Sequence, residues 1–394
     1  MKDQKRAAFK FIILLGVVSL FGDITYEGAR SITGPYLAVL GASAGIVGLV
    51  SGLGEFIGYG LRLVSGYFTD RTKAYWPLTF IGYGLILSIP FLAFTHYWQT
   101  ALIFIIMERM GKAIRSPARD AILSHATAQV GRGFGFGIHE AMDQIGAVIG
   151  PLIFSLVFIL KGGYREGFTI LWIPAVLTLG VLLIARLKVS SPVKFEEHGL
   201  GQVVKEDIKN NPERTRIFWL YILFIFLSVA GFLNFQLISY HLKVKAIVSD
   251  AQIPLFYAIA MAVDAFVAII IGKTYDRIGL KSLLTIPALT LCIPIFALSS
   301  RYSFLVIAVI LWGAVMGIHE TIMRAAIADI THIEKRGFAY GVFNAAYGFS
   351  WFFGSSVMGF LYGISNNLII IFVIMMEIFS LPVFLLLKKA SSRK

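Results

Sequence analysis

Long apolar segments follow one another along nearly the whole chain, and short polar stretches separate them. The apolar residues come in runs of about 20, the length that an α-helix needs to cross about 30 Å of hydrocarbon, and not in stripes with a 3.6-residue period. We therefore predict an all-α membrane protein with twelve transmembrane helices. The predicted spans are residues 10–38, 44–66, 77–94, 99–122, 133–160, 168–186, 217–241, 252–272, 282–298, 304–328, 337–362 and 368–387.

One longer polar segment, residues 188–216, lies between the sixth and the seventh predicted spans. It divides the chain into an N-terminal six-helix bundle (1–187), a cytoplasmic linker and a C-terminal six-helix bundle (217–394). Residues 203–209 could form a short helix on the membrane surface. A solvated linker without such a helix is an equally good interpretation.

The two halves carry the same short motifs in the same order. The pattern Gly-x-x-x-Asp-Arg occurs at Gly66–Arg71 after the second span and at Gly272–Arg277 after the eighth. The pattern Arg-Gly-Phe-x-x-Gly opens the fifth span at Arg132–Gly137 and the eleventh at Arg336–Gly341. This repetition predicts two pseudo-symmetric bundles that arose by duplication.

The composition agrees with a membrane protein. Of the 394 residues, 57% are hydrophobic and only 14% are charged, whereas a soluble domain is about a quarter charged. The net charge of +13 could indicate a nucleic-acid partner, but Lys and Arg lie at span ends and in loops, as the positive-inside rule expects. We therefore expect a lipid bilayer as the surroundings and no nucleic acid as a partner.

The placement of Lys and Arg also predicts the orientation. Both termini and the loops on their side carry many more of these residues than the opposite loops do. We predict a multi-pass protein of the cytoplasmic (inner) membrane with cytoplasmic N- and C-termini. The apolar run after the basic start is too long for a cleavable signal peptide.

Several kinds of chemistry are not indicated by any motif. The single cysteine, Cys292, allows no disulfide and no cysteine metal site within one chain. The chain has no Gly-x-x-x-x-Gly-Lys-Ser/Thr loop and no His-Glu-x-x-His pair, so direct ATP drive and a zinc site are not expected. We expect no enzyme activity, no cofactor, no metal and a monomeric chain.

Three charged residues of the first span, Asp23, Glu27 and Arg30, follow at spacings of four and three and so share one helical face. Counting about 1.5 Å per residue from Lys10 puts Asp23 about 20 Å from the cytoplasmic end, near mid-membrane. A charge at that depth costs at least about 2.5 kcal/mol and usually faces a cavity or a partner. We predict that Asp23 and Glu27 act in proton coupling and that all three residues line the substrate site. The alternative is a structural network in which Arg30 neutralises Glu27.

The fourth span carries several arginines. Arg109 lies near mid-membrane and is predicted to act in coupling and in substrate binding. Arg115 and Arg119 lie in the cytoplasmic third, where they could attract an anionic head group. Alternatively, they line the cytoplasmic mouth and pair with Asp70 and Asp120.

The fifth span contributes Glu140 and Asp143, which share one face. Asp143 is predicted to act in proton coupling and could pair with Arg109, and Glu140 is predicted to line the substrate site. The neighbouring His139 could titrate near neutral pH, although a lone histidine is more often a hydrogen-bonded structural residue.

Fewer charges lie at mid-depth elsewhere. Glu55 of the second span is predicted to line the site and to pair with Arg30 or Arg109. The eleventh span is aromatic, which suits an amphipathic or aromatic substrate, although ordinary packing would explain it equally well. The predicted substrate-binding residues of the second half are Asn234, Gln236, Glu320, Asn344 and Tyr347.

On these motifs the chain resembles the major facilitator superfamily over nearly its whole length. The turn at Gly66–Lys73 is similar to that family's signature loop between helices two and three. It departs from the pattern at Thr72 and Ala74, where a glycine is usual, whereas the second copy keeps Gly279. The resemblance implies a central cavity lined mainly by the first, fourth, seventh and tenth helices.

Two further features resemble the proton-coupled drug antiporters of that family. The segment Gly146–Pro151 is similar to their helix-packing motif Gly-x-x-x-Gly-Pro, with Gly146, Gly150 and Pro151 at its key positions, although the trailing glycines are missing. Arg109 is similar to the family's fourth-helix arginine, which is tied to proton coupling. The resemblance thus implies an exporter driven by protons.

We predict a proton-coupled secondary transporter that works by alternating access and exports amphipathic or aromatic small molecules. Uptake of a small organic anion is an alternative, which Arg30, Arg109 and Arg115 favour. A non-transporting receptor or lipid-handling scaffold is a third hypothesis.

The two Gly-x-x-x-Asp-Arg turns are predicted to form a conformational latch on the cytoplasmic side. Asp70 would lie near the N-terminus of the eleventh helix, where the helix dipole favours a carboxylate, or would pair with Arg119 while Arg71 meets Asp120. The predicted latch residues are Gly66, Asp70, Arg71, Arg119, Asp120, Gly272, Asp276 and Arg277.

Overall fold

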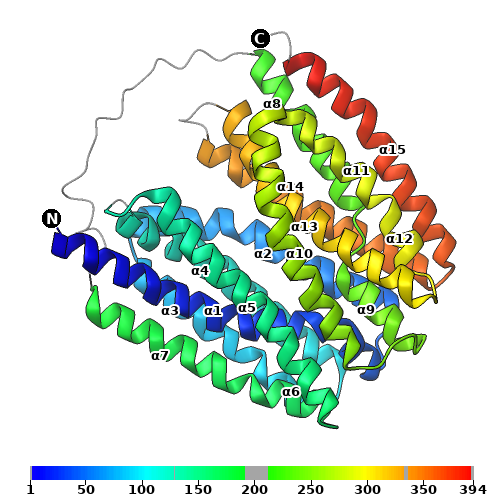
Figure 1. The fold of residues 1–394 in the computed structure, drawn as a ribbon, viewed down its shortest axis with the longest axis horizontal. Coiled ribbons are helices and arrows are strands. Elements are labelled where there is room, and N and C mark those ends of the chain that lie inside the picture. The colour runs from blue at the N-terminus through cyan, green and yellow to red at the C-terminus, as the bar shows by residue number, and fades with distance from the viewer. Residues whose placement is uncertain (1, 128, 191–211, 332–335, 392–394) are drawn as a thin grey trace. The chain divides into compact units, whose positions relative to one another are not determined.

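A computed structural model describes residues 2–127, 129–190, 212–331 and 336–391. These residues form helices joined by short turns, and no strand occurs among them. The first half contains α1 (Lys2–Val39), α2 (Ala44–Thr72), α3 (Tyr75–Gly84), η1 (Leu85–Ser88), η2 (Pro90–Phe94), α4 (Trp98–Thr127), α5 (Arg132–Ile159), α6 (Tyr164–Ile170) and α7 (Trp172–Lys188). The second half contains α8 (Pro212–Ala230), α9 (Phe235–Val244), α10 (Gln252–Ile278), η4 (Gly279–Leu284), α11 (Thr285–Thr290), α12 (Cys292–Ala297), α13 (Tyr302–Ile330), α14 (Arg336–Tyr362) and α15 (Asn366–Ser391) (Figure 1).

The prediction of an all-α membrane protein is confirmed. Each of the twelve predicted spans corresponds to one helix or to consecutive helical pieces. Among the described residues, nine stretches are long and apolar enough to cross a membrane, and one of them, Gln252–Ala297, covers two predicted spans. The helices α4 and α14 do not meet this test, and α4 carries the row of charges described below.

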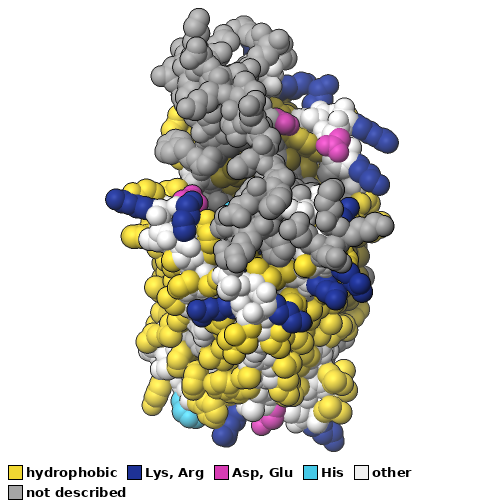
Figure 2. Space-filling view, turned by 90° about the vertical axis from the view of Figure 1, so that its left-hand side faces the viewer, with side chains coloured by type: hydrophobic (Ala, Val, Ile, Leu, Met, Phe, Trp, Pro, Cys, Tyr) yellow, Lys and Arg dark blue, Asp and Glu magenta, His cyan; other side chains and the backbone are white. Residues whose placement is uncertain are grey.

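The surface also has the character of a membrane protein. Figure 2 shows a face on which hydrophobic side chains predominate, with Lys and Arg side chains above and below them. On α7, for example, Ile173, Val176, Leu183 and Leu187 are exposed. In water these side chains would lose the free energy of burial, and a lipid bilayer removes that cost.

The seventh predicted span is not one continuous helix. α8 ends at Ala230 and α9 begins after a break at residues 231–234. Asn234 caps α9, because its side-chain oxygen accepts a hydrogen bond of 2.7 Å from the backbone N–H of Leu237. The third, sixth and ninth predicted spans are likewise built from shorter helical pieces.

The contacts within the chain define two compact units. Unit 1 comprises Met1–Ala29, Leu61–Thr95 and Ile103–Lys209, and unit 2 comprises Arg30–Gly60, His96–Leu102 and Asn210–Lys394. The boundaries therefore fall inside α1, α2 and α4. Most of the predicted linker, including residues 203–209, lies outside the described residues. The division into two bundles joined by that linker stays a prediction.

Each unit has its own core. In unit 1, Phe11 of α1 packs with Trp76 of α3 and with Leu123 and Leu182 of α4 and α7. In unit 2, the buried Trp312 of α13 is surrounded by aromatic rings of α8–α10 and the break, with Phe232, Phe235 and Tyr257 at centroid distances of 5.5, 5.3 and 5.9 Å. Rings at these distances contribute beyond the area that they bury.

Glycines let parts of α1 and α2 approach the second half closely within unit 2. A Cβ on Gly34 would lie 2.0 Å from the carbonyl oxygen of Gln236, and a Cβ on Gly48 would lie 2.3 Å from that of Ser355. Only a residue without a side chain fits at such distances. The backbones of these helices are therefore in direct contact there.

The two Gly-x-x-x-Asp-Arg turns share a positive φ at one position. α2 is followed by Lys73 with φ +54°, and α10 is followed by Gly279 with φ +59°. Both residues come seven positions after the first glycine of their motif. The missing glycine of the first copy therefore corresponds to Lys73, and neither Thr72 nor Ala74 occupies that position.

Replacing Lys73 with glycine should raise the free energy of unfolding by about 1 kcal/mol. A side chain in the left-handed region costs roughly 1–2 kcal/mol, and glycine avoids most of this cost. Thermal unfolding of the purified protein in detergent measures the change. Lys73→Ala is the matched control, because it removes the charge but keeps Cβ and should give no gain. An equal gain in both variants would show that the charge, and not the backbone, is responsible.

Candidate functional site

Nine charged side chains gather within unit 1, on α1, α4 and α5. We call them the charged cluster. Its members are Asp23, Glu27, Glu108, Arg109, Lys112, Arg115, Arg119, Asp120 and Asp143. The sequence analysis predicted functional roles for all of them except Glu108 and Lys112.

Tyr26 of α1 connects two cations of α4. The guanidinium of Arg109 donates a hydrogen bond to the Tyr26 hydroxyl, and its carbon lies 4.5 Å from the ring centroid. The ammonium of Lys112 lies 3.8 Å from the same centroid and 4.0 Å from a carboxylate oxygen of Glu27. A desolvated cation on an aromatic face gains on the order of 2 kcal/mol. Tyr26 thus holds α4 against α1 at the depth of Glu27.

Glu108 is almost completely buried and is bracketed by two arginines of its own helix. Its carboxylate oxygens lie 3.3 Å from Arg115 Nη2 and 3.8 Å from Arg109 Nε. Arg115 also lies over the ring of Tyr83, with 5.0 Å between the guanidinium carbon and the centroid. Arg115 therefore has both an acidic and an aromatic partner within unit 1.

Arg119 forms the next group of contacts. Its Nη2 lies 2.9 Å from Asp120 Oδ1, and its Nη1 lies 3.8 Å from Asp143 Oδ2. Asp143 also lies 3.6 Å from Nδ1 of His139, one turn earlier on α5. Asp143 thus pairs with Arg119, and the expected pairing with Arg109 is not the one that forms. The rotation of α5 about its axis decides this, and spacing along the sequence does not reveal it.

Ser19 of α1 lies at the centre of this group. Its hydroxyl is 3.1 Å from Arg119 Nη1, 2.9 Å from His139 Nε2 and 3.1 Å from the hydroxyl of Tyr83. These hydrogen bonds connect α1, α3, α4 and α5. Sequence reasoning missed Ser19 and Tyr83, because a neutral hydroxyl in an apolar run is common.

Asp23 is half-buried and lies in the field of the whole cluster. Lys112, Glu27, Arg115 and Arg119 all act on it electrostatically, and it acts in turn on Asp143. The two mid-membrane carboxylates of α1 and α5 are therefore coupled. A change in the charge of one of them changes the free energy of ionisation of the other.

The Gly146–Pro151 segment of α5 brings these helices together. A Cβ on Gly146 would lie 2.5 Å from the carbonyl oxygen of Leu20, and a Cβ on Gly150 would lie 2.4 Å from that of Ile24 and 2.7 Å from the backbone nitrogen of Gly28. α1 and α5 are thus in backbone contact beside Asp23. Pro151 is buried in the same contact.

Two further charged residues of the first half, Arg30 and Glu55, lie in unit 2. Arg30 Nη2 donates a hydrogen bond of 2.8 Å to Glu55 Oε1, and both side chains are buried. Arg30, one of the two partners predicted for Glu55, is thus a hydrogen-bonded partner of it. Glu27 lies 4.0 Å from Lys112 Nζ, and the alternative that Arg30 neutralises Glu27 stays a prediction.

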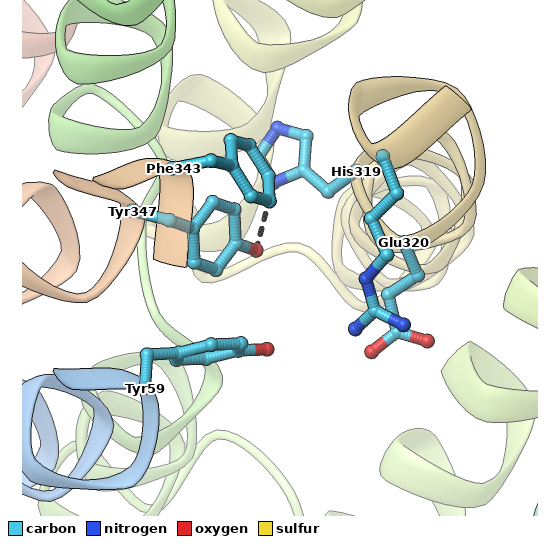
Figure 3. A pocket seen from close by; sticks show the side chains of 6 residues that line it. Tyr59, His319, Glu320, Phe343 and Tyr347 are labelled. Atoms are coloured by element: carbon cyan, nitrogen blue, oxygen red, sulfur yellow. Dashed lines mark hydrogen bonds between the residues drawn. The ribbon is translucent and has the colours of Figure 1, made fainter. Parts of the chain in front are cut away.

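A pocket also lies within unit 2. It is lined by Tyr59, His319, Glu320, Arg324, Phe343 and Tyr347. Figure 3 shows that the hydroxyl groups of Tyr59 and Tyr347 point toward the side on which Glu320 lies. The rings of Tyr59 and Tyr347 pack edge to face at 4.9 Å, and the Tyr347 hydroxyl is 3.4 Å from His319 Nδ1.

The pocket combines an aromatic wall with an acid and a base. Its empty space is about 190 Å³, but most of this is open to the outside, and the enclosed part of about 10 Å³ holds no more than about one water molecule. In this conformation the pocket is therefore closed, and a ring of a ligand would enter it only if the lining side chains moved apart. The sequence had predicted Glu320 and Tyr347 here, but not Tyr59, His319, Arg324 or Phe343.

The remaining predicted binding residues are members neither of the charged cluster nor of the pocket lining. Glu140 is exposed on α5, and Asn344 is half-buried on α14. Asn234 and Gln236 are buried at the start of α9, where Asn234 caps the helix and the Gln236 carbonyl lies against Gly34. Their roles in substrate binding stay predictions.

The predicted latch residues lie at the ends of α2 and α10. Asp70, Arg71, Asp276 and Arg277 are exposed. Arg71 donates a hydrogen bond of 2.9 Å to the hydroxyl of Tyr67, one turn earlier. Gly66 and Gly272 face α4 and α13, because a Cβ on each would lie 3.8 Å from Pro117 and 3.5 Å from Thr321. The first residues of α14, the expected partners of Asp70, follow a segment outside the described residues.

The described residues offer no group of three His, Cys, Asp or Glu side chains that could hold a metal ion. The chemistry of both groups is therefore that of fixed charges, hydroxyls and aromatic rings. Such side chains can bind a polar or aromatic ligand and exchange protons.

Comparison with known proteins gave matches over the whole length. Residues 15–286 and 237–394 match the family model described as Major Facilitator Superfamily. A protein of Mycobacterium tuberculosis named Rv2265 is 39% identical over 383 residues, which cover 95% of this chain and 92% of that protein. The MFS-type transporter MJ1317 of Methanocaldococcus jannaschii is 30% identical over 380 residues, with 93% and 92% covered.

Solved transporter structures share the fold. The nucleoside transporter NupG has a TM-score of 0.70 at 14% identity, with 98% of this chain and 100% of that chain covered. A variant of the peptide transporter POT has a TM-score of 0.74 at 13% identity, with 98% and 94% covered. A bacterial homolog of the human lysosomal transporter Spinster, in an inward-facing and occupied conformation, has a TM-score of 0.70 at 16% identity, with 97% and 96% covered.

Replacing Gly150 with alanine should lower the stability of the protein by about 1–3 kcal/mol, because the new Cβ would overlap backbone atoms of α1. Thermal unfolding in detergent measures the loss. Gly137→Ala on the same helix is the matched control, since a Cβ there meets nothing within 4 Å. If both variants lost the same stability, helix propensity and not the α1–α5 contact would be the cause.

Proposed function

The chain belongs to the major facilitator superfamily, and on that premise we propose that it is a proton-coupled secondary transporter that exports aromatic or amphipathic small molecules. The observation that carries this proposal is the charged cluster. Its carboxylates and cations lie inside membrane-spanning helices and are coupled to one another, so that binding or loss of a proton changes several contacts at once.

The proton-coupling residues are Asp23, Glu27, Asp143 and Arg109. Asp23 is half-buried and coupled to Asp143, which makes this pair the best site for uptake and release of a proton. Glu27 and Arg109 act through Lys112 and Tyr26, which contact both α1 and α4. A proton that crosses the membrane supplies about 2.3 kcal/mol per 100 mV of potential.

The pocket around Tyr347 is the proposed place for a ring of the substrate. Aromatic side chains supply contact area, and Glu320, Arg324 and His319 supply polar groups of both signs. A substrate with an aromatic part and a charged or hydrogen-bonding part fits this lining. A site built for a small anion would present cations without matching acids, whereas Arg30 and Arg115 lie beside Glu55 and Glu108.

Export is the direction that we propose. It rests on the likeness of Gly146–Pro151 to the motif of proton-coupled drug antiporters and on the aromatic pocket. Uptake of a small organic anion and a non-transporting receptor or lipid-handling scaffold are the competing functions. Purified protein in proteoliposomes with an imposed pH gradient distinguishes the three. The compounds to test are aromatic cations, aromatic carboxylates, nucleosides and dipeptides.

The exposed turns after α2 and α10 are proposed to act as the cytoplasmic latch. Asp70 and Arg71, with Asp276 and Arg277 in the second copy, are exposed and therefore able to exchange partners during a transport cycle. Arg119 and Asp120 pair with each other here, so that contacts of Arg119 with Asp70 and of Arg71 with Asp120 would belong to another state.

Replacing Asp23 with asparagine should abolish transport driven by a pH gradient and leave substrate exchange intact, because the amide keeps the shape but cannot change its charge. Flux of an accepted test compound into or out of proteoliposomes measures both modes. Glu166→Gln serves as the control, since Glu166 lies at the start of α6, outside the charged cluster. If transport by the Asp23→Asn variant kept the pH dependence of the unmodified protein, a coupling role for Asp23 would be refuted.

Replacing Tyr347 with alanine should raise the dissociation constant of an accepted aromatic compound about tenfold. Aromatic contacts contribute about 0.5–1.5 kcal/mol beyond buried area, and 1.4 kcal/mol corresponds to a factor of ten. Equilibrium binding to the purified protein measures the change. Phe360→Ala removes an exposed ring of the same helix and should leave affinity unchanged. Equal effects of the two variants would place the substrate elsewhere.

A further inference from the structure

A carboxyl group that belongs neither to the pocket nor to the charged cluster lies in the interior of unit 2. Glu377 of α15 is 0% exposed, and neither of its carboxyl oxygens has a hydrogen bond of good geometry among the described residues, although the Ser380 hydroxyl lies close enough to act on the carboxyl group. It lies eleven residues after Asn366, about 16 Å along the helix and so near mid-membrane. The hydroxyl of Ser380 donates to the backbone carbonyl of Glu377 at 2.7 Å.

The neighbour of this carboxyl group is the break between α8 and α9. A Cβ on Gly231, the first residue of the break, would lie 2.6 Å from Glu377 Oε1. The carboxyl group therefore lies against the C-terminal end of α8, where the helix dipole is negative. Across the break, the ten-residue α9 begins at Phe235 and presents its positive N-terminal end.

Within the part of the chain that the structure describes, no cation compensates this carboxyl group. α15 packs against α8, α11, α12, α14 and η4. Their titratable or charged side chains within the described residues, none of which acts electrostatically on Glu377, are Arg216, Tyr221, Lys281, Cys292, Tyr340, Tyr347 and Tyr362. An ionised carboxylate without a cation or a hydrogen-bond donor is far more costly in the membrane than the neutral acid.

From this geometry we propose that Glu377 is a proton-binding site, in addition to the charged cluster, and that its protonation controls the break between α8 and α9. In the conformation described here the carboxyl group is protonated and tolerates the negative end of α8. When water reaches it, the O–H bond breaks, the proton passes to a water molecule and the carboxylate keeps the electron pair.

The ionised group would then be repelled by α8 and attracted to the start of α9. Asn234 provides a donor there, because its side-chain nitrogen is buried without a hydrogen-bond partner while its oxygen caps α9. Movement of the carboxylate toward this amide and the first N–H groups of α9 would change the angle between the two helices. Proton loss is thereby converted into bending of the seventh span.

Trp312 reports on the break. Its indole Nε1 donates a hydrogen bond of 2.9 Å to the carbonyl oxygen of Leu233, and its ring stacks on Phe232 at 5.5 Å. Both partners belong to the break. Trp351 also packs on Phe232, edge to face at 5.6 Å, so a change in the break alters the surroundings of both tryptophans. The contribution of Trp312 is obtained by comparison with Trp312→Phe.

Infrared difference spectroscopy tests the proton site on the purified protein in lipid nanodiscs, without any substrate. A pH titration of the unmodified protein should show a band of a protonated carboxyl group that disappears as the pH rises. Glu377→Gln, which has the same size and is neutral, should lose this band completely, and Glu166→Gln should keep it. A spectrum unchanged by Glu377→Gln over the whole titration would overturn the proposal.

Tryptophan fluorescence tests control of the break in the same samples. The Trp312 signal should change with pH in step with the infrared band, and Glu377→Gln should remove this change. Gly231→Ala provides a second variant, because its Cβ would displace the carboxyl group and should shift the band to another frequency. A pH-independent Trp312 signal beside a titrating band would overturn the control of the break. Because no substrate or gradient is present, these outcomes are independent of the proposed transport function.

Discussion

The cost of removing a charge from water governs how the polar side chains of this protein are arranged. Inside a membrane that cost is several kcal/mol for a lone charge, and only an oppositely charged or hydrogen-bonding neighbour offsets it. In unit 1 these neighbours come from different helices. Lys112 of α4 lies between the ring of Tyr26 and the carboxylate of Glu27, both of α1, and Arg119 reaches Ser19 and Asp143. The charges thus hold α1, α4 and α5 together at mid-membrane depth, where apolar packing against lipid supplies little preference for one arrangement.

The same constraint connects this architecture to transport. In a nearly balanced cluster, adding a proton to one carboxylate leaves its former cation in need of another partner. Arg119 already has two carboxylate partners, Asp120 and Asp143, at 2.9 and 3.8 Å, and it can strengthen one contact when the other is lost. Ser19 and His139 lie next to Arg119, and their hydrogen bonds can rearrange when Arg119 exchanges one carboxylate partner for the other. A cluster of this kind has several arrangements of similar energy, which is what a protein with alternating conformations requires.

The amino-acid sequence was sufficient to predict the fold class, because runs of about 20 apolar residues leave few alternatives to membrane-spanning helices. It also named Arg30 as one of two possible partners of Glu55, and these two side chains are hydrogen-bonded. It failed for Asp143, because helical spacing tells which residues share a face but not which neighbour that face meets. Tyr26 and Ser19 were missed for a different reason: their roles come from the cations that surround them, and a hydroxyl in an apolar run has no signature of its own.

At the break in the seventh span, a neighbouring helix supplies a hydrogen bond that the local sequence does not. Asn234 is the only strongly polar residue in the break, and apolar residues continue on both sides of it, so hydrophobicity alone predicts a continuous span. Backbone groups freed inside a membrane must be satisfied by the protein. Here Trp312 of α13 binds the carbonyl of Leu233, and Asn234 binds the N–H of Leu237. The carboxyl group of Glu377, pressed against Gly231, has no such partner in this arrangement. The break is therefore stabilised by hydrogen bonds from α13 and from Asn234, whereas Glu377 of α15 adds none. We expect a rearrangement that satisfies Glu377 to involve residues 231–234.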